Sequence, residues 1–110
     1  MTEATFIQVI TTTAQREDAE KIAEVLVEKR LAACVQIIGL VRSIYRWQGN
    51  IERVEEWQCL IKSRHELYGD IEATIKEIHP YETPEIIALP VIAGCRDYLD
   101  WLGEELKKAC

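Results

Sequence analysis

The sequence predicts an α+β fold built on one antiparallel sheet, and three observations lead to this class. Two segments with helical spacing of apolar residues, 14–30 and 67–78, each follow a stretch rich in β-forming residues. Between them, residues 31–62 form a long strand-like run that is interrupted only by a glycine-containing turn. A further strand and a third amphipathic segment follow. The predicted order is β-α-β-β-α-β with an extra C-terminal helix, which is the split, ferredoxin-like arrangement.

The first half of the chain is expected to provide a strand, a helix and a second strand. Residues 6–10 are rich in β-forming side chains and predict the first strand. Thr13 is a suitable N-cap for the helix over 14–30, because its hydroxyl can accept a hydrogen bond from a free N–H of the first turn. The second strand is expected from Leu31 onwards, with a bend at Gly39.

A long β-hairpin is expected over residues 41–62, with Gly49 and Asn50 as its two turn residues. This register would place Arg46 opposite Arg53, and like charges in that position are unfavourable. The outer part of the hairpin also carries large apolar side chains: Tyr45, Trp47, Ile51, Val54 and Trp57. Either the hairpin folds back on its own sheet, or further copies of the chain cover it. We favour the second interpretation, a symmetric oligomer assembled through extended strands.

The second half of the chain is expected to add a helix, an edge strand and a last helix. Ser63 and Glu66 match a capping box, with Ser at the N-cap and Glu at the third helical position. The helix that they begin should end at Pro80, which cannot continue it. The fourth strand is expected over 85–92, and Pro90 within it predicts a sheet edge or a bulge.

Composition limits the classes of partner. The chain has 110 residues, 48% of them hydrophobic and 29% charged, with a net charge of −6, which suits one domain over 1–110. Because there is no basic stripe, we expect neither nucleic acid nor an anionic membrane surface as a partner. No apolar run approaches the ~20 residues that cross a bilayer. The first residues lack the basic start of a secretory signal, so we expect a cytoplasmic location.

The cysteines and the missing catalytic motifs argue against several activities. Cys34, Cys59, Cys95 and Cys110 are scattered without the spacing of a zinc site or a disulfide framework. The first three lie in or beside apolar segments and are expected to be buried, whereas Cys110 is expected to be exposed. The sequence contains no nucleophile elbow, no phosphate-binding loop and no dinucleotide fingerprint. An enzyme is therefore not predicted.

Residues 79–91 place an imidazole, a phenol and two carboxylates on a loop stiffened by Pro80 and Pro84. His79 and Glu82 together offer ligands that suit a divalent cation such as copper or zinc. Two other interpretations stay open. The whole segment can be a helix stop followed by a strand start, and His79 can be a residue that caps the C-terminus of the helix. Spacing alone favours the cap.

Five segments resemble, in sequence and in order, the CutA divalent-cation tolerance proteins. The most specific is His-Pro-Tyr-Glu-Thr-Pro-Glu at 79–85, and the others are residues 31–35, 43–49, 60–63 and 98–102. The resemblance implies a ferredoxin-like subunit, a homotrimer formed through the long strands, and a non-enzymatic role in tolerance of copper and other divalent ions. The family trimer is similar to that of the PII signalling proteins. A regulatory trimer that binds a small anionic ligand, with Lys62 as counter-charge, and a scaffold for a partner protein are therefore alternatives.

The resemblance also implies candidate site residues. Some bacterial members carry a cysteine at the end of the first strand and a His-His pair before the proline, proposed as copper ligands. This chain has Thr11 and Ile78 at those positions, so a remaining metal site would use His79 with Glu82 or with a neighbouring chain. The family-matching residues expected to line a pocket between subunits are Tyr45, Trp47, Glu56, Lys62, His79, Tyr81 and Glu82. The alternative is that these residues only stabilise the trimer.

Overall fold

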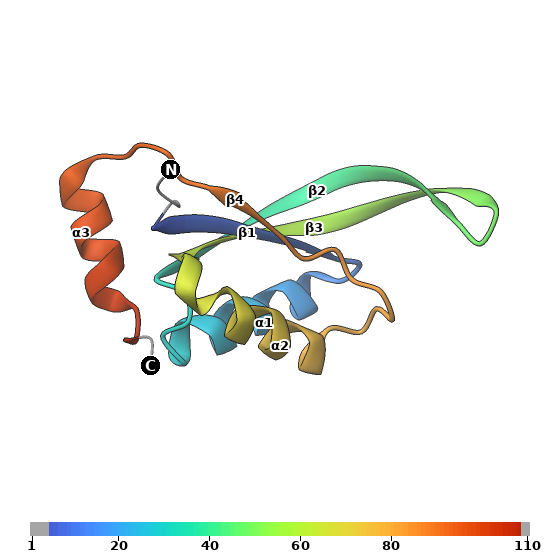
Figure 1. The fold of residues 1–110 in the computed structure, drawn as a ribbon. Helices are drawn as coiled ribbons and strands as arrows, with labels where there is room; N and C mark the ends of the chain where they lie inside the picture. The colour runs from blue at the N-terminus through green and yellow to red at the C-terminus, as the bar shows by residue number, and fades with distance from the viewer. Residues whose placement is uncertain (1–4, 109–110) are drawn as a thin grey trace.

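The strands and helices follow the predicted order. The computed structural model describes residues 5–108 (Figure 1). Its elements are β1 (Phe6–Thr13), α1 (Arg16–Glu28), β2 (Cys34–Trp47), β3 (Asn50–Arg64), a 3₁₀ turn (His65–Leu67), α2 (Tyr68–Ile78), β4 (Ile87–Pro90) and α3 (Arg96–Glu105). The predicted α+β class and the extra C-terminal helix are therefore confirmed.

The four strands form one sheet in the order β2-β3-β1-β4, and every neighbouring pair is antiparallel. β4 lies at the edge, where it pairs only with β1, and Pro90 is opposite Ile7. The edge position predicted from Pro90 is therefore confirmed. Proline lacks a backbone N–H, and it is tolerated in an edge strand because one side of that strand forms no hydrogen bonds to a neighbouring strand. The strand itself is shorter than the expected 85–92.

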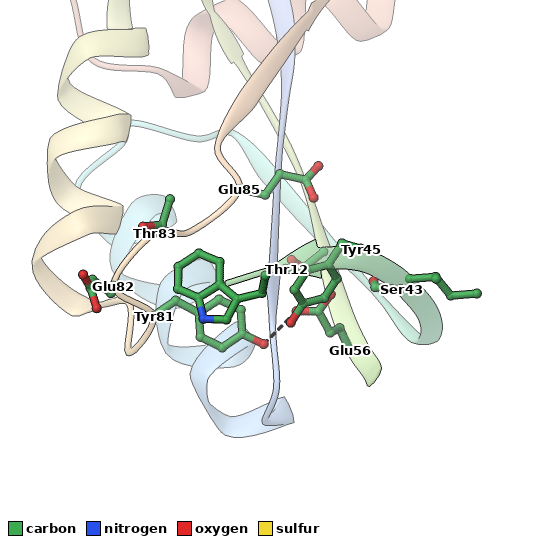
Figure 2. Close-up of a pocket in the computed structure, with 10 residues that line it drawn as sticks. Thr12, Ser43, Tyr45, Glu56, Tyr81, Glu82, Thr83 and Glu85 are labelled. Atoms are coloured by element: carbon green, nitrogen blue, oxygen red, sulfur yellow. Dashed lines mark hydrogen bonds between the residues drawn. The ribbon is translucent and has the colours of Figure 1, made fainter. Parts of the chain in front are cut away.

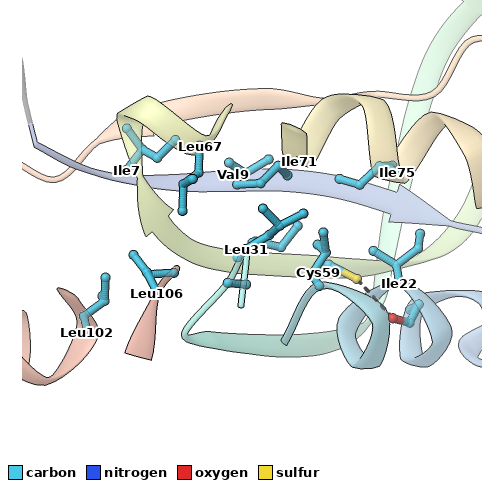
Figure 3. Close-up of a cluster of buried hydrophobic side chains, with 14 residues drawn as sticks. Ile7, Val9, Ile22, Leu31, Cys59, Leu67, Ile71, Ile75, Leu102 and Leu106 are labelled. Atoms are coloured by element: carbon cyan, nitrogen blue, oxygen red, sulfur yellow. Dashed lines mark hydrogen bonds between the residues drawn. The ribbon is translucent and has the colours of Figure 1, made fainter. Parts of the chain in front are cut away.

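The core lies between the sheet and two helices. α1 and α2 cover one face of the sheet, and α3 stands at the end of the sheet where β1 begins (Figure 1). Ile7 and Val9 point to the covered face because side chains alternate along a strand, and both are buried. The cluster seen in Figure 3 consists of Ile7, Val9, Ala19, Ile22, Leu26, Leu31, Ala32, Cys59, Ile61, Leu67, Ile71, Ile75, Leu102 and Leu106.

The cysteine expectations are only partly correct. Cys59 is fully buried, and its Sγ lies 3.7 Å from the carbonyl oxygen of Ala19. Cys34 is half-buried, and Cys95 is exposed at the start of α3, contrary to the prediction. The apolar neighbours of Cys95 in the sequence belong to a loop whose side chains mostly face outward. Cys110 lies outside the described residues.

The register of the hairpin differs from the prediction. The turn residues are Gln48 and Gly49, with φ angles of 49° and 83°, and both are positive as a type I′ hairpin turn requires. Trp47 consequently pairs with Asn50, and Arg46 faces Ile51 rather than Arg53. The predicted contact between two arginines does not form, because the turn starts one residue earlier in the chain than expected.

The expected bend at Gly39 is confirmed. The pairing of β2 with β3 shifts between Ile38 and Val41, which marks a β-bulge. A Cβ atom added at Gly39 would collide with the indole ring of Trp57, so only glycine fits at this point of the strand. The bulge separates the inner half of the hairpin, which belongs to the four-stranded sheet, from an outer half.

Neither predicted N-cap acts as one. Thr13 lies within β1, and its hydroxyl donates to the carbonyl oxygen of Gln15 at 2.7 Å, so α1 begins later than expected. Ser63 lies within β3, and its buried hydroxyl donates to the carbonyl oxygen of Leu31 at 2.6 Å. In both cases a hydroxyl that could cap a helix instead satisfies a carbonyl group next to the sheet.

The outer part of the hairpin, residues 41–56, is called here the outer ribbon. β1 pairs with β3 only from Trp57 to Arg64, so the outer ribbon has no third strand within residues 5–108. Its apolar side chains are correspondingly open to solvent, and Ile44 is 62% exposed. A two-stranded hairpin of this kind is marginal by itself in water.

Candidate functional site

The proline-stiffened loop after α2 starts at His79, whose backbone N–H donates to the carbonyl oxygen of Ile75 at 2.8 Å. His79 is the C-cap of α2 and has extended φ and ψ angles, as expected for a residue before proline. The alternative that made His79 a capping residue is confirmed for its backbone. Its imidazole, however, does not turn back to the end of the helix.

The imidazole of His79 is fixed by two hydrogen bonds, and the residue as a whole is only 8% exposed. Nδ1 accepts a hydrogen bond from the backbone N–H of Tyr81 at 3.1 Å, so the ring proton is on Nε2. Nε2 lies 2.7 Å from the carbonyl oxygen of Thr12 and donates to it. The ring therefore holds the loop against the end of β1, and neither nitrogen has a lone pair available for a metal ion.

The phenol of Tyr81 connects this loop to the outer ribbon. Its hydroxyl donates to Oε2 of Glu56 at 2.7 Å, as Figure 2 shows. Burial, together with the hydrogen bond to the Glu56 carboxylate and the negative charge of that group, raises the pKa of Tyr81 well above its ordinary value. Tyr81 is therefore a neutral hydrogen-bond donor at physiological pH, and it keeps the carboxylate of Glu56 in place.

A pocket of about 560 Å³ lies between the outer ribbon and the loop (Figure 2). Side chains on alternate positions of β2 share one side of the ribbon with Glu56, which is paired with Val41. The pocket is lined by Thr12, Ser43, Ile44, Tyr45, Trp47, Glu56, Tyr81, Glu82, Thr83 and Glu85. Three carboxylates are among these residues and no lysine or arginine is, so the lining is acidic and aromatic.

The structure brings together most, but not all, of the predicted site residues. The pocket includes Tyr45, Trp47, Glu56, Tyr81 and Glu82. Lys62 is not part of the lining, and its ammonium group donates instead to Oε1 of Gln36 at 2.9 Å. His79 contributes to the position of the loop and is not part of the lining either.

Sequence reasoning missed five lining residues: Thr12, Ser43, Ile44, Thr83 and Glu85. Ser43 had a readable signal, because it precedes Tyr45 and Trp47 at the two-residue spacing of one strand face. Thr83 belongs to the same predicted loop as Tyr81, and Glu85 lies at the expected start of the fourth strand. Thr12 had no signal, since it joins the pocket only through the packing of the loop against β1.

The donor set for a metal ion is incomplete in one chain. Thr11 is fully buried, and its hydroxyl has no hydrogen-bond partner among the described residues. Ile78 packs against the core, so the two positions that hold proposed ligands in some relatives provide none here. Within residues 5–108, no cluster of three or more His, Cys, Asp or Glu side chains is arranged to hold a metal ion. The prediction of His79 and Glu82 as ligands stays a prediction, and this conformation of His79 does not fit it.

Fold and site together define a small α+β protein of the ferredoxin-like type, with an acidic aromatic pocket beside an uncovered ribbon. No helix between residues 5 and 108 has the length and apolar character needed to cross a membrane. The sequence profile of the family described as CutA1 divalent ion tolerance protein matches residues 7–105. The chain therefore belongs to this family of divalent-cation tolerance proteins, as its sequence segments predicted.

Individual relatives agree with this assignment. The chain is 46% identical over 96 residues to the divalent-cation tolerance protein CutA of Thermus thermophilus, covering 87% of this chain and 93% of that protein. The structure of CutA1 from the psychrotrophic bacterium Shewanella sp. SIB1 superimposes with a TM-score of 0.93 at 39% identity, covering 97% of this chain and 100% of that one. A structure described as the periplasmic divalent cation tolerance protein CutA of Archaeoglobus fulgidus has a TM-score of 0.90 at 36% identity, covering 93% and 99%. The family names refer to ion tolerance and to no enzyme class.

Proposed function

We propose that this chain works as a non-enzymatic, cytoplasmic homotrimer that binds divalent cations and contributes to tolerance of metal ions. One observation carries the preference for cations: the pocket between the outer ribbon and the loop is lined by three carboxylates and by no lysine or arginine. The family to which the chain belongs supports the same direction. The competing hypothesis of an anionic ligand relied on Lys62, which contacts Gln36 outside this pocket.

The homotrimer is supported by the uncovered apolar side chains of the outer ribbon. Ile44 and Ile51 are each more than half exposed, although large apolar groups gain about 1.5–3 kcal/mol each on full burial. Both long edges of the ribbon also offer free backbone groups that further strands can pair with. Three copies that cover one another's ribbons would bury these groups in a closed arrangement.

The metal ligands in this proposal are exposed carboxylates rather than His79. Glu82 and Glu85 are both solvent-exposed on the loop, and a neighbouring copy would complete the set. Oxygen ligands suit magnesium, calcium and manganese, whereas copper and zinc prefer nitrogen or sulfur. Binding of copper or zinc, which the resemblance implies, would require His79 to give up its bond to Thr12 or to Tyr81.

Analytical ultracentrifugation tests the assembly. We expect a species of three times the 12.7 kDa chain mass at micromolar concentration. Ile44→Asp should shift the distribution towards the single chain, because a charge would enter the contact between ribbons. Val27→Asp on α1, where the apolar side chain is 44% exposed, is the matched control and should leave the mass unchanged. A wild-type protein that sediments as a single chain at this concentration would refute the homotrimer.

Isothermal titration calorimetry with Cu²⁺, Zn²⁺ and Mn²⁺ tests the metal site. We expect saturable heat from the wild type and its loss in the variant that combines Glu82→Gln with Glu85→Gln. Glu104→Gln on α3 is the control for the loss of an exposed carboxylate. His79→Ala separates the two sets of ligands, because it should abolish binding only if the imidazole coordinates the ion. The absence of saturable heat with every ion would refute the metal site, and cell fractionation tests the cytoplasmic location.

A further inference from the structure

Glu56 is the most unusual polar side chain of the pocket. The residue is only 4% exposed, and Oε2 accepts the hydrogen bond from Tyr81. No hydrogen bond to Oε1 is observed within residues 5–108, and no lysine, arginine or histidine of this part of the chain forms an ion pair with Glu56. A cation that reaches this carboxylate from the pocket gains a charge-assisted interaction with it.

Aromatic rings surround this carboxylate. Tyr45, Trp47 and Tyr81 line the same pocket, and they come from β2 and from the loop on the other side. The faces of such rings attract cations, and they do so most strongly for large, weakly hydrated ones such as substituted ammonium and guanidinium groups. A carboxylate among aromatic rings is therefore matched to an organic cation.

The size of the pocket argues in the same direction. A single metal ion needs several ligands within about 2–2.6 Å, and the described residues contain no cluster able to supply them. A volume of about 560 Å³ lies instead in the range of sites for small organic molecules, which is ~300–1,000 Å³. The pocket is wider than a single metal ion needs, and it has room for a molecule with an apolar body.

We propose that this pocket binds a small organic cation, with an ammonium or guanidinium group held at Glu56 and an apolar stem lying against Tyr45 and Trp47. The N–H groups of the cation donate to Oε1 of Glu56, while Tyr81 continues to donate to Oε2. Glu82 and Glu85 at the exposed loop add negative charge that attracts the cation. This site goes beyond the proposed metal binding, because Glu56, Tyr45 and Trp47 carry it, whereas Glu82 and Glu85 of the same pocket are the proposed metal ligands.

Calorimetry with agmatine and putrescine tests the proposal on the full-length protein as purified. Neutral 1,4-butanediol and anionic succinate are the matched probes, because they have the same four-carbon body as putrescine. We expect saturable binding of the two cations only. Glu56→Gln should weaken it by about tenfold or more, because it removes the charge that accepts the hydrogen bonds. Trp47→Leu should weaken it by about three- to tenfold, and Glu104→Gln should not change it.

Tyr81→Phe keeps the proposal testable where Glu56→Gln fails to fold. It leaves the carboxylate but removes the group that positions it, so we expect weaker binding with an unchanged number of sites. Equal affinity in wild type and Glu56→Gln, or equal heats from butanediol and putrescine, would overturn the proposal.

Arg46 and Arg53 of another copy are a second source of a guanidinium group. Binding that is absent in the wild type and appears in Arg46→Ala or Arg53→Ala would assign the pocket to that copy and overturn the small-molecule site.

Discussion

The two ends of the β2–β3 hairpin contrast sharply, although they belong to the same pair of strands. At the inner end, β3 lies between β2 and β1, and helices α1 and α2 cover one face, so that Cys59 and Ile61 are fully buried. At the outer end the same strands have no further strand and no helix over them within residues 5–108, and Ile44 and Ile51 are exposed. One chain completes its core at one end only. The pocket lies at the junction of the inner and outer ends, between the outer ribbon and the loop after α2.

This difference teaches that burial and the third strand β1, rather than the pairing of β2 with β3, distinguish the two ends. Both are fully paired across the hairpin apart from the bulge at Gly39. Only the inner end adds a hydrophobic core, which is the dominant favourable term in folding. We therefore expect substitutions at the inner end to act on the folding of each chain, and substitutions at the outer end to act on contacts between chains.

The largest expected effect compares Ile71→Ala with Ile44→Ala. Ile71 is 0% exposed in α2, so its truncation should lower the free energy of unfolding by about 2–5 kcal/mol at any protein concentration. Ile44→Ala should change the stability of a dissociated chain by less than ~0.5 kcal/mol. Its effect should appear only where copies associate, as a changed concentration dependence of the urea midpoint. Equal, concentration-independent losses for both variants would contradict the distinction.

The next effect concerns the pH dependence of the inner end. Burial raises the pKa of the Cys59 thiol from 9.0 to about 11. As the pH rises, the Cys59 thiol is deprotonated in the unfolded chain before it is deprotonated in the folded chain. The contribution of this thiol to stability is therefore fully present below pH 9 and is lost as the pH rises from about 9 to 11. The loss should amount to about 2–3 kcal/mol, since one pKa unit corresponds to 1.36 kcal/mol.

Urea denaturation between pH 8 and 11 measures this loss. Cys59→Ala should remove this part of the slope, whereas Cys95→Ala, at an exposed thiol, should retain it. A slope that stays the same in Cys59→Ala would show that other groups cause it. Thiol-modifying reagents offer an independent measurement, because folded protein should react at Cys95 well before Cys59.

The smallest effect concerns the tip of the outer ribbon. Gly49 has a φ angle of +83° and open space around its Cα, so Gly49→Ala should cost about 1 kcal/mol through backbone strain alone. Gly69 in α2 also has open space but no positive φ angle. Gly69→Ala should therefore stabilise the protein by up to about 1 kcal/mol. Thermal unfolding of both variants checks the opposite signs, and destabilisation by Gly69→Ala would contradict the explanation.

The fold could be predicted from the sequence because its signals are local. Periodic apolar residues define α1 and α2, and prolines mark the end of α2 and the edge strand. The hairpin register was wrong because two overlapping dipeptides, Gln48-Gly49 and Gly49-Asn50, both suit a two-residue turn, and only the paired strands decide between them. The helix caps were wrong because a hydroxyl can satisfy either a free N–H or a nearby carbonyl group.

The candidate site was predictable in its residue types and not in its contacts. The resemblance to the family, rather than a pattern within the sequence, placed Tyr45, Trp47 and Tyr81 in one set. The bond between Tyr81 and Glu56 joins residues far apart in the chain, and the bonds of His79 depend on the packing of its loop against β1. No local pattern reports such distant partners. For that reason the sequence left His79 open as a metal ligand, and the structure uses both of its nitrogens.

The hydroxyl–carboxylate bond from Tyr81 to Glu56 has a mechanical consequence. It connects the loop after α2 to the outer ribbon, so any tilt of the ribbon must stretch this bond or move the loop with it. In the proposed homotrimer, a neighbouring copy bound to the outer ribbon would therefore influence the width of the pocket. By thermodynamic linkage, a ligand bound in the pocket would then strengthen the association of the copies by the same factor by which association strengthens binding of the ligand.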